Sequence, residues 1–94
     1  MRREKTLPNR QIEQRVHEFV LKRFPLARKK RVTESDPLLE SGVIDSLGML
    51  DLVSALEAEF AIAISDEELL PENFQTVANI ASFVARKTEK IAAR

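Results

Sequence analysis

The chain contains no cysteine, tryptophan or tyrosine, and only two glycines, among its 94 residues. Without cysteine it can form neither disulfide bonds nor cysteine-ligated metal sites, so the fold must depend on packing. One histidine, His17, and the lack of a calcium-loop pattern also argue against a metal site. No apolar run approaches the roughly 20 residues that a membrane span needs, and none follows the basic start of the chain as in a secretory signal. We therefore expect one small domain in the cytoplasm.

Lysine and arginine are absent from the long stretch between Val32 and Ala85. This stretch holds eleven acidic residues and so carries a charge of −11, while the rest holds all fifteen basic residues and four acids, a charge of +11. Such a field attracts basic partners to the middle of the chain and argues against nucleic-acid binding there. The basic run Arg28–Arg31 is a weak signal for nucleic acid or an anionic membrane. We interpret it as a solvated loop or as a contact with the acidic middle.

The spacing of apolar residues predicts three longer helices. The first runs from about Arg10 to Arg23 and is ended by Pro25, and the second begins at Asp45-Ser46 and ends near Ala61. The last follows a Thr76 cap, and the chain from Lys90 onward is expected to fray. The three apolar faces comprise Ile12, Val16, Phe19 and Val20; Met49, Leu52, Val53, Leu56 and Phe60; and Val77, Ile80, Ala81 and Val84.

A short third helix is expected over Asp66–Leu70, because Ser65 and Glu68 form a capping-box pattern and Pro71 closes the segment. No helical period is visible from Leu26 to Asp45, which predicts an ordered crossover loop. The expected fold class is all-α, a four-helix bundle with a long loop between helices 1 and 2. The domain spans 1–94, with a core at about 9–88 and flexible tails at 1–8 and 89–94.

The segment from Glu40 to Leu47 resembles the acyl carrier protein family. The signature of that family is Asp-Ser-Leu at the start of the second helix, after a glycine-containing loop. Here Asp45-Ser46-Leu47 follows Gly42, and the resemblance covers about residues 10 to 88. It continues through Leu52-Val53, Leu56-Glu57, Glu59-Phe60 and Ile64 to Asp66-Glu67-Glu68. A departure is Gly48, where many members have an acidic or polar residue; it costs about 1 kcal/mol of helix propensity and would allow a partner to approach closely.

The resemblance implies that Ser46 carries a covalent 4′-phosphopantetheine arm, whose thiol holds cargo as a thioester. A helix N-terminus suits the anionic phosphodiester of the arm. Asp45 is then the acid at the helix start and a contact for the transferase, and Asp45 and Leu47 are implied as cofactor-binding residues beside Ser46. The implied docking face for partner enzymes comprises Leu47, Leu50, Asp51, Ser54 and Glu57. The implied partners are a phosphopantetheinyl transferase, an acyl-loading ligase or transferase, and synthases with basic docking patches, acting on a monomeric carrier that catalyses nothing itself. An apolar cleft for an acyl chain is a further expectation.

Other interpretations stay open from the residues alone. Asp45 or Ser46 could serve only as an N-cap, and the acidic face could be merely solvated. The cargo could be aminoacyl or peptidyl, loaded by a discrete adenylating ligase, although the approach Val43-Ile44-Asp45 resembles the acyl carriers more than the glycine-richer peptidyl carriers. An unmodified helical interaction module and a hydrolase that pairs Ser46 with His17 are the remaining alternatives.

Overall fold

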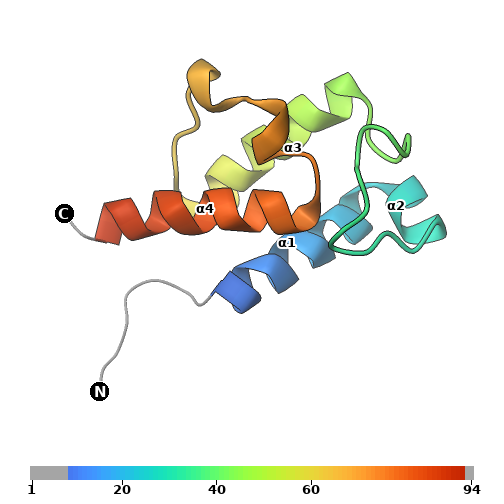
Figure 1. Ribbon diagram of the computed structural model, residues 1–94, viewed down its shortest axis with the longest axis horizontal. Coiled ribbons are helices and arrows are strands. Elements are labelled where there is room, and N and C mark those ends of the chain that lie inside the picture. The colour runs from blue at the N-terminus through green and yellow to red at the C-terminus, as the bar shows by residue number, and fades with distance from the viewer. Residues whose placement is uncertain (1–8, 93–94) are drawn as a thin grey trace.

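The computed structural model describes residues 9–92, with side chains of 10–88, and these residues form helices and loops (Figure 1). The three long helices are α1 (Asn9–Arg23), α3 (Ser46–Phe60) and α4 (Val77–Ala92). A short helix, α2 (Pro25–Lys29), follows α1, and two 3-10 turns, η1 (Asp66–Glu68) and η2 (Pro71–Asn73), join α3 to α4. Residues 1–8, expected as a tail, lie outside the described part.

One apolar core holds the helices together. α1 and α4 pack along each other (Figure 1), and α3 closes the core through one face. The positions predicted to face inward on α1 and α4 are buried, with Phe19 only partly so, and Phe83 joins them. On α3, Leu52, Val53 and Leu56 are buried, whereas Met49 and Phe60 are half-buried against the same core. The spacing argument therefore identified the core face of each long helix correctly.

The ends of α3 and the start of α4 follow the capping residues seen in the sequence. Asp45 is the N-cap of α3, and Ala61 ends the helix in the left-handed conformation at φ +54°. The hydroxyl of Thr76 accepts a hydrogen bond from the Asn79 amide at 3.1 Å, which confirms its capping role. α4 continues to Ala92, past Lys90 where fraying was expected.

The prediction of a helix-free segment from residue 26 to 45 is wrong at its beginning. α1 does end at Arg23, but Pro25 then occupies the first turn of α2. Proline is favoured there, because its fixed φ suits a helix and its missing N–H needs no partner. Ala27 is fully buried and anchors α2 to the core. The short α-helix of the fold is therefore this one.

The expected helix over Asp66–Leu70 is a single 3-10 turn, η1, and Pro71 opens η2 instead of only closing the segment. The capping box is present, with the Ser65 amide donating to Glu68 Oε1 at 3.0 Å. A 3-10 turn suits a segment this short because each residue bonds only three positions back. Phe74 ends the segment buried against Phe83, with ring centroids 5.3 Å apart.

The crossover from α2 to α3 is an ordered part of the fold. The Leu38 amide donates to the carbonyl of Gln75 at 2.9 Å, and the Ala78 amide donates to the carbonyl of Glu34 at 3.0 Å. The side chain of Leu38 is fully buried. These contacts fasten the crossover to the start of α4, and with it the loop that leads into Ser46.

Candidate attachment and docking site

Ser46 is the first residue of α3, and it is exposed. The turn before it contains Gly42 at φ +80°, a conformation that favours glycine. The carboxylate of Asp45 accepts the Gly48 amide at 2.7 Å, and the Asp45 carbonyl accepts the Met49 amide at 2.8 Å. A helix start leaves about four amides without helical partners. The backbone amides of Ser46 and Leu47 therefore have no partner within the helix and can bind an incoming anion.

Gly48 lies against the aromatic side chain of Phe24. A β-carbon added to Gly48 would lie 3.2 Å from Phe24 Cε1 and 3.1 Å from both Asp45 Oδ1 and Ile44 Cγ2. The missing side chain therefore gives Phe24, between α1 and α2, room to pack on the first turn of α3. From the sequence we expected the missing side chain of Gly48 to make room for a partner. In the structure, Phe24 of the same protein packs there.

An apolar hollow of about 230 Å³ lies beside Ser46. It is bounded by α3 on one side and by the segment 69–74 on the other. Its lining residues are Leu39, Ser46, Met49, Leu50, Val53, Leu69, Leu70, Pro71 and Phe74. Except for Ser46 these side chains are all apolar, so the hollow suits hydrocarbon more than polar cargo.

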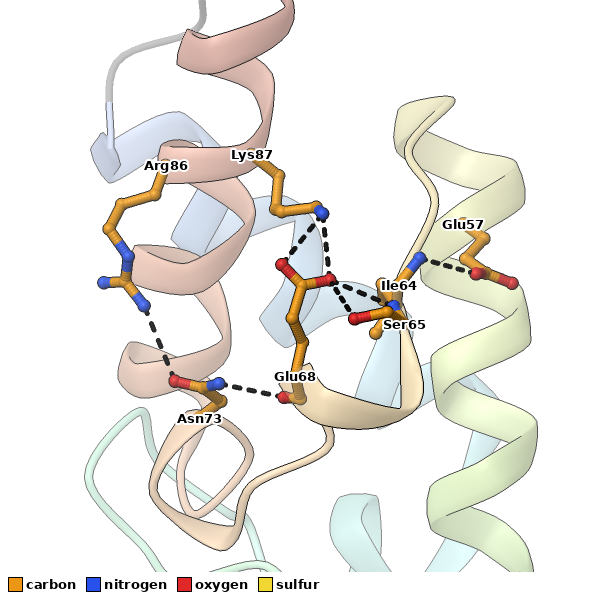
Figure 2. A network of polar contacts seen from close by, with 7 residues as sticks. All are labelled: Glu57, Ile64, Ser65, Glu68, Asn73, Arg86 and Lys87. Atoms are coloured by element: carbon orange, nitrogen blue, oxygen red, sulfur yellow. Dashed lines mark hydrogen bonds and ion pairs between the residues drawn. The ribbon is translucent and has the colours of Figure 1, made fainter.

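A polar network beside the segment 69–74 ties that part of the chain to α4 (Figure 2). Lys87 of α4 donates to both carboxylate oxygens of Glu68 at 2.9 Å, and Asn73 Nδ2 donates to the Glu68 carbonyl at 2.9 Å. The hydrogen bond from the Ser65 amide and the nearby Lys87 ammonium lower the pKa of Glu68 from its ordinary value of 4.5. The ionised carboxylate thus ties η1 to α4.

The five residues proposed as a docking face differ in their availability. Leu47 and Leu50 are 77% and 57% exposed, and Ser54 is exposed as well. Asp51 is bound by Arg23 of α1, whose Nε and Nη2 donate to its two oxygens at 2.9 and 2.8 Å. Glu57 is half-buried, and its Oε2 accepts the Ile64 amide at 2.8 Å. The freely presented part of this face is therefore mainly apolar.

The basic run does not contact the acidic residues, contrary to one of our interpretations. Arg28 donates to the carbonyl of Leu21 at 2.9 Å, and Lys30 donates to the carbonyl of Ser41 at 3.2 Å. The acidic stretch is instead paired by Arg15, Arg23 and Lys87, through Glu59, Asp51 and Glu68.

His17 contacts the crossover loop. Its Nε2 donates to the Val32 carbonyl at 2.7 Å, and its Nδ1 lies 3.5 Å from Glu34 Oε2. Both ring nitrogens are thus engaged, and neither contact involves Ser46, so the geometry of a serine–histidine catalytic pair is not formed.

Two features are absent from residues 9–92. No cluster of three or more histidine or carboxylate side chains is placed to hold a metal ion. No helix in the same range is both long and apolar enough for a membrane span.

Comparison with known proteins gives the family. The family model described as "phosphopantetheine attachment site" matches residues 14–84, a range that includes Ser46. The chain belongs to the acyl carrier protein family. It is 36% identical over 74 residues to an acyl carrier protein homolog of Mycoplasmopsis pulmonis, covering 79% of this chain and 97% of the relative.

Two further relatives of this carrier protein have similar coverage. The acyl carrier protein of Buchnera aphidicola subsp. Acyrthosiphon pisum is 33% identical over 79 residues, covering 84% of this chain and 95% of the relative. The probable acyl carrier protein PigG of a Serratia species is 29% identical over 75 residues, covering 80% and 86%. As a member of this family, the chain is a carrier protein and not an enzyme.

The cofactor that follows from the family is covalently bound 4′-phosphopantetheine. The carrier offers what such a group needs: an exposed serine hydroxyl at a helix start, two free amides for the phosphodiester, and an apolar hollow beside them. The sequence had indicated the serine and an apolar cleft. It did not indicate that Arg23 would bind Asp51 or that the segment 69–74 would bound the hollow, because these groups meet α3 from other parts of the chain.

Proposed function

We propose that Ser46 is the attachment point of the phosphopantetheine arm, and that the carrier holds acyl intermediates there as thioesters. The thiol of the bound arm supplies the thioester chemistry. In this proposal Asp45 and Leu47 flank the attachment point, and partner enzymes dock on α3. We place the carrier in fatty acid, polyketide or related biosynthesis, the pathways that the family resemblance of its sequence implies.

The observation that supports this proposal most is the placement of Ser46. Its side chain is exposed on the first turn of α3, and two backbone amides beside it are free to face an anion. A transferase can therefore reach the hydroxyl without opening the fold. Asp45 contributes by capping α3 through the Gly48 amide and so holding this turn in place.

The apolar hollow supports an acyl cargo over an aminoacyl one. It adjoins Ser46, and it is lined by leucine, methionine, valine, proline and phenylalanine side chains. A hydrocarbon chain that enters it leaves water and contacts these side chains, while a charged amino group would lose hydration there.

The docking part of the proposal assigns Leu47, Leu50, Asp51, Ser54 and Glu57 to partner contacts. A phosphopantetheinyl transferase, a loading ligase or acyltransferase, and synthase enzymes are the partners proposed. The exposure of Leu47 and Leu50 supports an apolar contact at the centre of this face.

Intact-mass measurement tests the attachment site. The unmodified protein is incubated with coenzyme A and a broad-specificity phosphopantetheinyl transferase. We expect a gain of one phosphopantetheine group, which Ser46→Ala abolishes. Ser35→Ala removes another exposed hydroxyl, on the crossover loop and outside the docking face, and should leave the gain unchanged. A gain that survives Ser46→Ala, or no gain with several transferases, would contradict the proposal.

A further inference from the structure

The acidic groups of α3 are bound within the protein itself. Asp51 accepts two hydrogen bonds from Arg23, Glu59 pairs with Arg15, and Glu57 accepts the Ile64 amide. These are all three carboxylates of the helix. The two arginines come from α1, so the basic N-terminal helix neutralises two of the three carboxylates of the helix on which partners are proposed to dock.

The pair of Arg23 and Asp51 is the one placed to affect recognition. Asp51 lies one position after the exposed Leu50, inside the proposed docking face. The two nitrogens of Arg23 bind its two oxygens in the forked geometry that suits arginine and that lysine cannot reproduce. Both side chains remain nearly half exposed, so an approaching partner can reach the pair.

We propose that Arg23 determines which partners the carrier accepts, by occupying Asp51. An enzyme whose docking patch needs a free carboxylate at this place must first displace the Arg23 guanidinium. An enzyme that contacts Leu47 and Leu50 through apolar side chains meets no such competition. The surface thus favours partners with an apolar contact opposite these leucines and disfavours partners with a lysine or arginine opposite Asp51. This inference rests on the proposed docking function of α3.

The test uses steady-state kinetics of phosphopantetheinylation, with a broad-specificity transferase that has a lysine- and arginine-rich docking patch. Arg23→Gln frees Asp51, and we expect the KM for the carrier to fall about two- to fivefold with kcat unchanged, the size of one exposed ion pair. This fall in KM should become smaller as the salt concentration is raised. Asp51→Asn should remove the fall in KM in the Arg23→Gln background.

Lys22→Gln is the matched control, because it removes the same charge from the adjacent position and Lys22 forms no ion pair with the side chains described, those of residues 10–88. It should not reproduce the fall in KM. Arg23→Lys should lie between wild type and Arg23→Gln. Thermal unfolding of each variant checks that the fold is kept.

The outcomes separate the two proposals. If Arg23→Gln and Lys22→Gln change the KM equally, the selecting role of Arg23 is wrong. The same holds if the fall in KM persists when Asp51→Asn is added to Arg23→Gln. Attachment at Ser46 stands in both cases. If no variant containing Ser46 is modified, the proposed function itself fails.

Discussion

At the scale of single residues, Asp45 links the fold to the attachment site. Its carboxylate accepts the Gly48 amide at 2.7 Å and begins α3 one residue before Ser46. Replacing an N-cap aspartate by alanine leaves that amide unpaired. The same substitution would also remove the acid proposed to contact the transferase, so stability and recognition must be separated.

Asp45→Ala should lower the free energy of unfolding by about 1 kcal/mol, the usual cost of a lost N-cap. Asp45→Asn keeps an oxygen that can accept the Gly48 amide and should lose only a few tenths of that amount. Urea unfolding measures both. If the two variants are equally destabilised, the charge of Asp45 matters more than its hydrogen bond.

The low helix propensity of Gly48 is offset by a tertiary contact. Alanine there would gain about 1 kcal/mol of helix propensity. Its β-carbon, however, would crowd Phe24, Asp45 and Ile44 at 3.1 to 3.2 Å. We therefore expect Gly48→Ala to leave the free energy of unfolding unchanged or to lower it by up to about 1 kcal/mol.

A double-mutant cycle with Phe24→Leu identifies the cause. The shorter side chain should relieve part of the crowding, so Gly48→Ala should be more favourable in that background by at least about 0.5 kcal/mol. Urea unfolding of the four proteins gives this value. An increase of about 1 kcal/mol from Gly48→Ala in the wild-type background would show that Phe24 does not restrict the position.

At the scale of elements, the sequence predicted what depends on near neighbours. α3 begins at Ser46 after the Asp45 cap and ends before Ala61, because caps and apolar spacing are local signals. α2 was missed because a proline after a helix suits both the end of one helix and the first turn of another. The two 3-10 turns have too few residues for any period to show.

The candidate site likewise has features that local sequence predicts and features that depend on how the helices pack. Ser46 and the exposed leucines were identified from a short motif and from spacing. The pairing of Asp51 with Arg23 joins residues 28 positions apart, and that of Glu68 with Lys87 joins residues 19 apart. Such pairs depend on how helices pack, which no local pattern encodes. The acidic face was therefore predicted from its composition, but the pairing of Asp51 and Glu59 with arginines of α1 was not.

The segment between α3 and α4 should respond to acid through Glu68. The Ser65 amide and Lys87 lower the pKa of this carboxyl in the folded protein from its ordinary value of 4.5. A lowered folded pKa gives stability that is present above the unfolded value and is lost as the pH falls through the folded value. The contribution of Glu68 is therefore complete at neutral pH and declines below about pH 4.5.

Glu68→Gln should reduce stability at pH 7 and flatten its decline from about pH 5 to pH 3, because glutamine has no charge to lose. Glu72→Gln is the control, since Glu72 is exposed on the same segment and has no ion pair within the described residues. Urea unfolding at several pH values measures the slopes. Equal slopes for wild type and Glu68→Gln would remove Glu68 as a cause of acid sensitivity.

At the scale of the whole molecule, the division into basic ends and an acidic middle is used in part for ion pairs within the protein. Arg15 and Arg23 of α1 and Lys87 of α4 each reach a carboxylate in the stretch from Val32 to Ala85. Charge segregation along a chain therefore need not give a charged docking surface. Here it leaves an exposed apolar region around Ser46, formed by Leu39, Leu47, Leu50 and Leu70.

The hollow beside Ser46 leads to a prediction about the loaded carrier. An acyl chain lying there would bridge α3 and the segment 69–74 in the folded state only, so it should raise stability as its length increases. Each methylene that becomes fully buried contributes about 0.8 kcal/mol, and 1 kcal/mol shifts the Tm of a domain this small by roughly 4–8 °C. Loading the protein with acetyl, butyryl and octanoyl phosphopantetheine should therefore raise Tm in that order.

A pair of leucines with similar exposure tests where the chain lies. Leu70 lines the hollow and is 44% exposed, whereas Leu26 is 47% exposed on α2 and lies outside it. Leu70→Ser makes one wall polar and should weaken the dependence of Tm on chain length, while Leu26→Ser should preserve it. If Tm does not change from acetyl to octanoyl in the wild-type carrier, the chain stays in solvent. The cargo would then have to be recognised by the partner enzymes alone.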